Sequence, residues 1–195
     1  MPRRFAVTFD YRCPFAYNGI TAVAAALRGG ADIDVRFVAF SLDQIHVPEG
    51  EPPVWTRDPA DRGSGVAALC TGIAVRDHYP EQFLAAHLEL FAARHDRAAQ
   101  LADPAVLGDA VARAGLDPDA VARIADLPET LETLAREHTE MVERYEIFGV
   151  PTFVAGTEAA FVRFMEREDV ASLERVLDLL DLPAINEFKR TRVPR

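Results

Sequence analysis

Cysteine is scarce in this chain of 195 residues, which holds only Cys13 and Cys70. Two cysteines are too few for the disulfide framework of a small secreted domain, and they favour a reducing compartment. No stretch approaches the roughly 18 consecutive apolar residues that a membrane-spanning helix needs. The apolar stretch 5–9 after Arg3 and Arg4 is too short for the core of a secretion signal. We therefore expect a cytoplasmic protein with no membrane partner.

Basic side chains are also outnumbered, since 21 lysine and arginine residues stand against 31 acidic ones and leave a net charge of −10. This balance disfavours nucleic acid and anionic membrane surfaces as partners. The histidines lack metal-ligand spacing, such as two of them four residues apart beside a glutamate, so no metal site is expected. Apolar residues, in contrast, make up 49% of the chain. A chain of this size can hide about 70% of its unfolded surface in one packed domain with an insertion.

Near the N-terminus a strand pattern leads into a cysteine at the start of a helix. Apolar residues alternate with period two over 5–9, which predicts a strand. Pro14 suits the first helical position, and apolar residues recur at helical spacing over 15–27. Unpaired N–H groups and the helix dipole at such a site can lower a cysteine pKa from about 8.5 to roughly 3.5–7.5. Cys13 is therefore predicted to be an acidic, reactive thiol.

The rest of the chain alternates between strand and helix patterns. Residues 33–40 have period two and predict a strand parallel to the first one. Residues 42–65 lose this periodicity amid proline, glycine and charge, which predicts an irregular loop. Asp-Pro pairs that begin at Asp103 and Asp117 predict the starts of two helices. The remaining expected elements are helices within 66–127, a helix over 131–145, a strand over 150–156, a partner strand over 161–164 and a helix over 170–180.

Two stretches together resemble a known family. The residues from Asp10 to Tyr17, and Gly149-Val150-Pro151-Thr152-Phe153 far downstream, resemble the DsbA-like thiol-disulfide oxidoreductases, a branch that includes kappa-class glutathione transferases and 2-hydroxychromene-2-carboxylate isomerases. The resemblance implies an α/β class, with a thioredoxin-like fold and an inserted all-helical subdomain over the active face. The expected division is a thioredoxin-like domain over 1–41 and 130–195, an irregular loop over 42–65 and the helical insertion over 66–129.

One position departs from the family's pattern, because Ala16 stands where dithiol members have the second cysteine of Cys-Pro-x-Cys. A single thiol stops at a mixed disulfide until an external thiol arrives. The resemblance also implies that the Val150-Pro151 bond is cis and faces Cys13, and that the Val150 backbone binds an extended thiol substrate. The expected catalytic residue is Cys13, and the expected substrate-binding residues are Arg12, Pro14, Phe15, Ala16, Val150 and Pro151.

The predicted function is that of a monothiol oxidoreductase in which Cys13 attacks a disulfide or another electrophile. A low-molecular-weight thiol of the glutathione or mycothiol type is the expected co-substrate, with no tightly bound cofactor, and an extended peptide is a further candidate substrate. One alternative is a thiol-dependent isomerase or transferase of the hydroxychromene-carboxylate or kappa type, although comparable members carry serine at the position of Cys13. Another alternative is a non-catalytic module that binds a thiol or peptide. A homodimer is left open.

Several other polar side chains have structural interpretations beside the functional ones. Cys70 lies on the apolar face of its predicted helix and is interpreted as a core residue. His87 shares a face with phenylalanines and is interpreted as a hydrogen-bonded core residue. Asp10 is expected to serve the turn after the first strand. For Arg12, contact with the thiolate or with a substrate carboxylate and a solvated loop position are both open.

Overall fold

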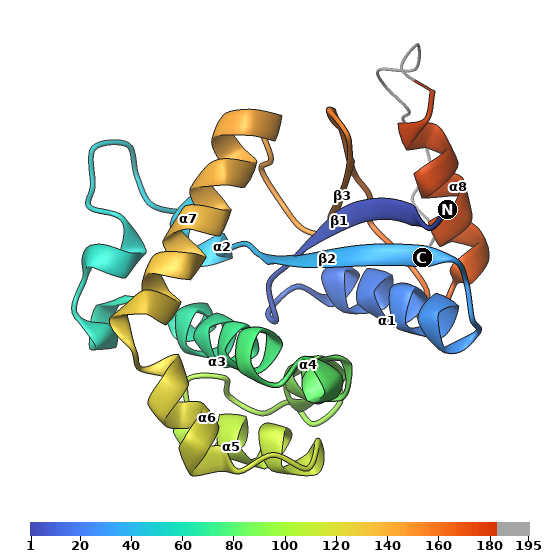
Figure 1. Ribbon diagram of the computed structural model, residues 1–195. Helices are drawn as coiled ribbons and strands as arrows, with labels where there is room; N and C mark the ends of the chain where they lie inside the picture. The colour runs from blue at the N-terminus through green and yellow to red at the C-terminus, as the bar shows by residue number, and fades with distance from the viewer. Residues whose placement is uncertain (183–195) are drawn as a thin grey trace.

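The computed structural model describes residues 1–182, and its centre is a four-stranded mixed sheet with the order β2-β1-β3-β4 (Figure 1). The two strands near the N-terminus pair in parallel, and the two later strands add an antiparallel hairpin beside the first strand. The thioredoxin-like α/β class expected from the sequence is confirmed. The strands are β1 (Arg3–Phe9), β2 (Ile33–Ala39), β3 (Thr152–Ala155) and β4 (Glu158–Phe161).

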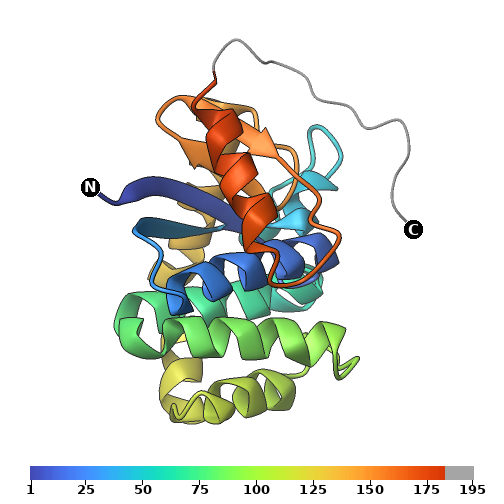
Figure 2. The same ribbon diagram turned by 90° about the vertical axis from the view of Figure 1, so that its right-hand side faces the viewer.

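Helices cover both faces of the sheet. Helix α1 (Pro14–Arg28) makes the crossover between β1 and β2, and α8 (Val170–Leu180) lies beside it (Figure 2). On β2, the side chain of Phe37 packs against α4, whereas the adjacent Arg36 pairs with a glutamate of α7. Because neighbouring residues of a strand point to opposite faces, α4 and α7 lie on opposite faces of the sheet.

The stretch 64–145, which lies between the two halves of the sheet, is helical, as expected. It holds α3 (Ser64–His78), α4 (Pro80–His95), α5 (Pro104–Arg113) and α6 (Pro118–Ala125) and leads into α7 (Pro128–Tyr145). The predicted caps are confirmed, because the carboxylates of Asp103 and Asp117 each accept a backbone N–H from the first turn of the following helix. The predicted boundary at 129/130 lies inside α7, and the division into domains stays a prediction.

Several predicted elements need correction. The stretch 42–65 is less irregular than expected, because it holds the short helix α2 (Leu42–Ile45) and two turns of 3₁₀ helix at 54–56 and 59–61. The partner strand lies at 158–161 instead of 161–164, because the chain reverses at Gly156, whose φ is 60°. The predicted strands 33–40 and 150–156 are shorter than expected and span 33–39 and 152–155. The C-terminal tail falls outside the described residues.

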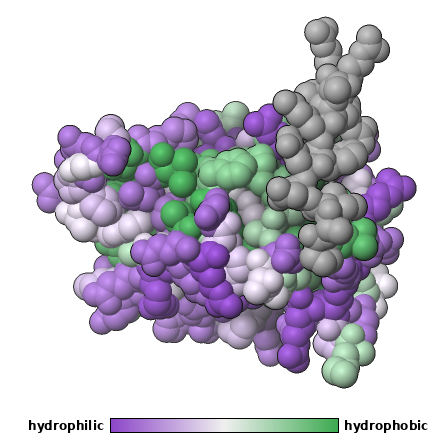
Figure 3. Space-filling view, turned by 90° about the horizontal axis from the view of Figure 1, so that it is seen from above, coloured by the Kyte–Doolittle hydropathy of each residue, from purple (hydrophilic) through white to green (hydrophobic). Residues whose placement is uncertain are grey.

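The surface agrees with the charged composition of the chain. Seen from above, it is mostly hydrophilic, and hydrophobic residues gather near the middle of the view (Figure 3). Within residues 1–182, none of the helices has the length and apolar character needed to cross a lipid bilayer. The largest fully buried side chains are mostly aromatic or branched aliphatic, and they come from the sheet and from α1, α3, α4, α7 and α8 as well as from the loops that follow β1 and β2.

Candidate active site

Cys13 is the N-cap residue of α1, so its side chain lies where the first turn of the helix leaves backbone N–H groups unpaired. Its Sγ accepts a hydrogen bond from the N–H of Ala16 at 3.4 Å. The thiol in turn donates to the carbonyl oxygen of Val150 at 3.3 Å. The fold therefore brings together two residues that are 137 positions apart in the sequence. Their proximity was expected from the resemblance alone.

The loop that carries Val150 is fixed by contacts to β1 and α1. Its Val150-Pro151 peptide bond is cis. The N–H of Thr152 donates to the hydroxyl oxygen of Thr8 on β1 at 2.9 Å. Gly19 of α1 lies so close to the loop that an added Cβ would be 3.1 Å from Cγ of Pro151. This glycine lets the loop pack directly on the helix that begins at Cys13.

Burial changes the acidity that the sequence predicts for Cys13. The side chain is only 9% exposed, and this burial raises the pKa of the thiol above its ordinary value. The N–H groups of Ala16 and Phe15 lower that pKa, as expected at a helix N-terminus, but their effect is smaller than the cost of burying the anion. The prediction that the Cys13 thiol has a lowered pKa is therefore wrong. The sequence shows the helix start but not how tightly the loop at Val150 covers it.

Arg12 and the buried Asp10 form an ion-paired framework in the loop that precedes Cys13. The carboxylate of Asp10 is fully buried and accepts the N–H of Arg12 at 2.9 Å and that of Leu42 at 2.8 Å. Burial raises the pKa of Asp10, and the Arg12 guanidinium and these N–H groups oppose that rise. The guanidinium also pairs with Asp43 at 2.7 Å. Asp10 has the turn role expected of it. Arg12 is already engaged by two carboxylates, and its part in substrate binding stays a prediction.

Tyr11 and His87 connect the site to the helical block. The hydroxyl of Tyr11 forms a 2.8 Å hydrogen bond with Nδ1 of His87, and both side chains are fully buried. Burial lowers the pKa of His87 to about 3, so its ring is neutral near pH 7. Phenylalanine rings surround it, including Phe9 and Phe83. The interpretation of His87 as a hydrogen-bonded core residue is confirmed.

Arg163, just beyond β4, is the residue near the thiol that sequence reasoning missed. Its guanidinium carbon lies 5.5 Å from the ring centroid of Phe15. Its charge lowers the pKa of Cys13, although by less than the nearby N–H groups do. Unlike Arg12, it forms no ion pair within residues 1–182, and its side chain is exposed. No motif marks this position, because only the fold of the β3-β4 hairpin brings it to α1.

The remaining predicted site residues line the first turn of α1. Pro14 is exposed, Phe15 is half-buried and Ala16 is fully buried. The second cysteine, Cys70, is buried in α3, where burial raises its pKa to about 12. It is a core residue, as interpreted from the sequence. Within the described part of the chain, no group of three or more His, Cys, Asp or Glu side chains could hold a metal ion.

Comparison with known proteins assigns the chain to a family. The model of the DSBA-like thioredoxin domain matches residues 6–178, which is most of the chain. The chain belongs to this family. The comparison with curated protein sequences gives no match. In this DSBA-like chain, Ala16 occupies the third position after the capping cysteine, so the first turn of α1 carries one thiol.

Solved structures of the family share its fold. One is the cytosolic disulfide reductase DsbM from Pseudomonas aeruginosa with GSH, at 18% identity and a TM-score of 0.64, covering 90% of this chain and 99% of the other. Another is the catalytic domain of ScsC from Proteus mirabilis, at 19% identity and a TM-score of 0.61, covering 91% and 82%. NmDsbA1 from N. meningitidis has 17% identity and a TM-score of 0.61, covering 93% and 84%. At these identities the likeness concerns the fold alone.

Proposed function

We propose that this DSBA-like protein is a monothiol oxidoreductase in which Cys13 exchanges with disulfides. The observation that carries the proposal is the position of the Cys13 sulfur, which accepts the Ala16 N–H and donates to the Val150 carbonyl. A sulfur held between a helix N-terminus and a loop backbone has a fixed direction of attack. The fully buried Ala16 supplies no second thiol, so release of product requires an external one.

The proposed cycle has two exchange steps. Cys13 first loses its proton to solvent, and the thiolate attacks one sulfur of a disulfide while the other sulfur leaves as a thiolate. A small external thiolate then attacks the mixed disulfide, which forms a new disulfide and returns Cys13 as a thiolate. Once Cys13 is in a disulfide it has no S–H to donate, and the carbonyl of Val150 becomes free for a substrate N–H. An extended peptide would use that carbonyl in the manner of an added strand.

The proposed co-substrate is a small thiol of the glutathione or mycothiol type, and the glutathione type, which carries carboxylate groups, is the better fit. Arg163 supports this class, because its exposed cation lies over Phe15 beside the thiol and is free of ion pairs within the described residues. An arginine of this kind suits a carboxylate. The DsbM structure, which contains GSH, is a fold neighbour in which such a thiol is bound. Arg163 is thus the better candidate for this contact than Arg12.

We also propose that the protein works in the cytoplasm. Both of its cysteines are free, and a monothiol mechanism needs a supply of reduced small thiol. The cytosolic DsbM agrees with this location, whereas other neighbours belong to the DsbA and ScsC types. The substrates proposed are small-molecule disulfides and exposed peptide disulfides, with no nucleic acid and no membrane as partners.

A non-catalytic binding module is the second candidate. The observation in its favour is the buried, hydrogen-bonded thiol of Cys13, whose pKa lies above its ordinary value. A thiol that is mostly protonated near pH 7 reacts slowly, because the thiolate is the nucleophile. Such a site could hold a thiol or a peptide against Val150 without turnover. The two candidates differ in whether a covalent bond to Cys13 forms and is released.

The test is an intact-mass measurement on the reduced protein after incubation with oxidised glutathione, followed by peptide mapping. The proposal predicts one glutathione on Cys13, removed by reduced glutathione, and steady consumption of a small mixed disulfide. Cys13→Ser should form no adduct, whereas Cys70→Ser, the matched control, should behave like the wild type. An adduct on Cys70, or no adduct, contradicts the proposal. An adduct that forms without turnover favours the binding module.

A further inference from the structure

Strand β2 lies at the edge of the sheet and pairs within residues 1–182 only with β1. The N–H of Phe40 donates to Phe9 of β1, so the even-numbered residues of this strand direct their backbone groups toward β1. The odd-numbered residues of β2 therefore direct their N–H and C=O groups outward. An edge of this kind is able to add a further strand unless it is covered.

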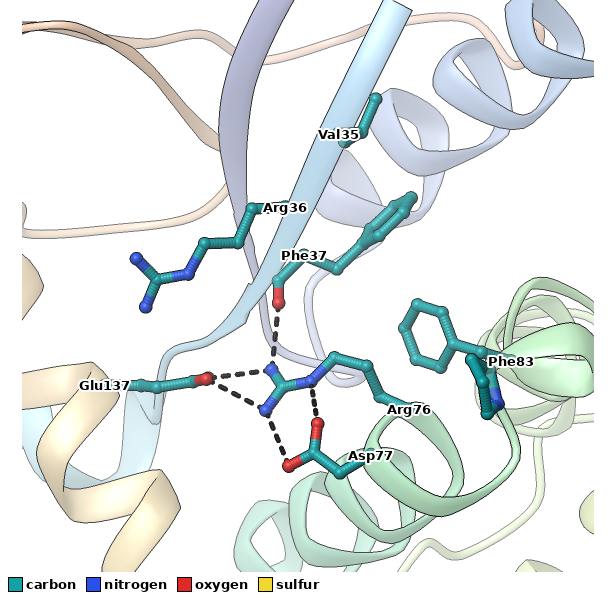
Figure 4. Close-up of a pocket in the computed structure, with 8 residues that line it drawn as sticks. Val35, Arg36, Phe37, Arg76, Asp77, Phe83 and Glu137 are labelled. Atoms are coloured by element: carbon teal, nitrogen blue, oxygen red, sulfur yellow. Dashed lines mark hydrogen bonds and ion pairs between the residues drawn. The ribbon is translucent and has the colours of Figure 1, made fainter.

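Side chains cover only the C-terminal half of this edge. The carbonyl of Phe37 accepts a hydrogen bond from Nη1 of Arg76, and the N–H of Ala39 donates to Oε2 of Glu137, each at 2.9 Å (Figure 4). At the N-terminal half, the N–H of Ile33 is used by the carbonyl of Ala31. Five outward groups of the strand remain without a partner in the described part of the chain. Four lie on the open half, namely the N–H and C=O of Val35, the N–H of Phe37 and the C=O of Ile33, and the fifth, the C=O of Ala39, lies at the covered end.

A pocket lies along this open edge. Its volume is about 440 Å³, and it opens between β2, α3, α4 and α7 (Figure 4). On the side of α4, the wall is apolar, formed by Phe37, Pro80 and Phe83. On the opposite side, Arg76 and Glu137 form the ion pair that covers the end of the strand. The pocket therefore offers room for an apolar side chain beside the unpaired backbone groups.

We propose that a second copy of this chain docks here, with β2 paired antiparallel to β2 about a two-fold axis at Val35. In that register the two Val35 residues exchange two hydrogen bonds, and the N–H of each Phe37 donates to the carbonyl of Ile33 in the other copy. These bonds use the four unpartnered groups on the open half of each strand. The side chain of Ile33 from the second copy then faces the pocket beside Phe37.

The charges of β2 select this register. With the axis at Val35, Asp34 of each copy lies opposite Arg36 of the other, in a close non-hydrogen-bonded pair. With the axis at Asp34 or Arg36, two like charges would lie directly opposite each other, which is destabilising. An axis further along the strand meets the covering side chains of Arg76 and Glu137.

Asp34 and Arg36 remain able to form further ion pairs. Asp34 pairs with Arg4 at 3.1 Å and Arg36 with Glu140 at 3.3 Å, and both pairs are largely exposed. Exposed pairs of this kind contribute little to stability. In the dimer, Asp34 of one copy would contact Arg36 of the other. The two existing ion pairs would then join into a row of alternating charges along one face of a continuous sheet.

The test is the molar mass of the full chain in solution, measured by sedimentation equilibrium over a range of concentrations. The wild type should be a dimer that weakens as salt is added, because its cross-axis charges are screened. Asp34→Arg places arginine opposite Arg36, and Arg36→Asp places aspartate opposite Asp34. Each single variant should raise the dimer dissociation constant by about tenfold or more.

Mixing the two variants gives the decisive result. An equimolar mixture of Asp34→Arg and Arg36→Asp should form heterodimers as tight as the wild-type dimer, because opposite charges face each other again. The matched control is the exposed pair on α5, where Asp109→Arg and Arg113→Asp should leave the dimer unchanged. Circular dichroism verifies that each variant is folded. A monomeric wild type, including one that binds extended peptides at this edge, or single variants that dimerise as the wild type does, would overturn the proposal.

Discussion

The two cysteines of this chain are both buried, with exposed fractions of 9% for Cys13 and 5% for Cys70, and burial raises the pKa of both. Their surroundings differ. Cys13 caps α1 and exchanges hydrogen bonds with Ala16 and Val150, whereas within residues 1–182 the thiol of Cys70 makes no hydrogen bond. Donors to sulfur stabilise a thiolate, and apolar walls do not. Position at the end of a helix, rather than burial, distinguishes the proposed nucleophile from the core residue.

The largest effect on the reactivity of Cys13 is expected from Ala16→Cys, which places a second thiol on the same turn of α1. We expect a disulfide between residues 13 and 16 under oxidising conditions and a dithiol reductase activity that the wild type lacks, because the second thiolate can release the product. Peptide mapping and reduction of a protein disulfide measure these two outcomes.

Ala16→Ser is the matched control, since serine has a similar size but no thiol, and it should show neither the new bond nor the new activity. If the thiol introduced by Ala16→Cys stays free under oxidant, the side chains at positions 13 and 16 do not face each other.

Replacing each cysteine by serine should separate function from stability. Cys70→Ser places a hydroxyl in an apolar site and should lower the free energy of unfolding by about 1 to 3 kcal/mol, with adduct formation unchanged. Cys13→Ser should abolish adduct formation and change stability by less than about 0.5 kcal/mol, because serine is a good N-cap. Urea unfolding and intact mass measure the two effects. A reversed pattern would exchange the roles assigned to the two residues.

Gly19→Ala tests whether packing of the Pro151 loop on α1 sets the reactivity of Cys13. The added Cβ would lie 3.1 Å from Cγ of Pro151 and 3.4 Å from Phe164. We expect a loss of about 1 kcal/mol in unfolding free energy and a changed alkylation rate of Cys13, because overpacking displaces the loop.

Gly108→Ala on α5 is the control, since its Cβ would meet Pro118 at an ordinary 3.4 Å and helix propensity should stabilise it by roughly 0.5–1 kcal/mol. Equal behaviour of the two variants would refute this role of Gly19.

The smallest expected effect is on the pH dependence of alkylation. The alkylation rate should increase with pH as the thiolate forms. Because burial raises the pKa of Cys13, the midpoint of this increase should lie above that of an exposed cysteine. Arg163→Gln should move the midpoint higher, since the lost cation had favoured the thiolate. Arg123→Gln, an exposed change on α6, should not move it. A midpoint below that of an exposed cysteine would show that the helix terminus outweighs burial.

Much of the fold was predictable because its signals are local. The period-two pattern before Asp10 and the Asp-Pro pairs at Asp103 and Asp117 correspond to observed strands and caps. The hairpin was misplaced by three residues because the turn depends on a positive φ at Gly156, which the flanking apolar residues do not reveal. The short helix α2 was missed because its four residues make about one turn, which is too short for a helical repeat of apolar residues to be recognised.

The site was predictable in its members but not in its electrostatics. A cysteine before Pro14 indicated the helix start, and the resemblance indicated the loop at Val150. The raised pKa depends on how closely that loop covers the sulfur, which is a tertiary property. Likewise, Arg163 approaches Phe15 only through the path of the β3-β4 hairpin. Contacts that depend on long-range packing cannot be predicted from the local spacing of residues.

The most direct test of Cys13 as the reactive thiol is a competition between the two cysteines for oxidised glutathione in the folded protein, followed by peptide mapping. We predict a glutathione adduct on Cys13 that reduced glutathione removes, with Cys70 unmodified until the protein is unfolded. An adduct on both residues at equal rates, or on Cys70 first, would contradict the claim that the N-cap of α1 makes Cys13 the reactive thiol.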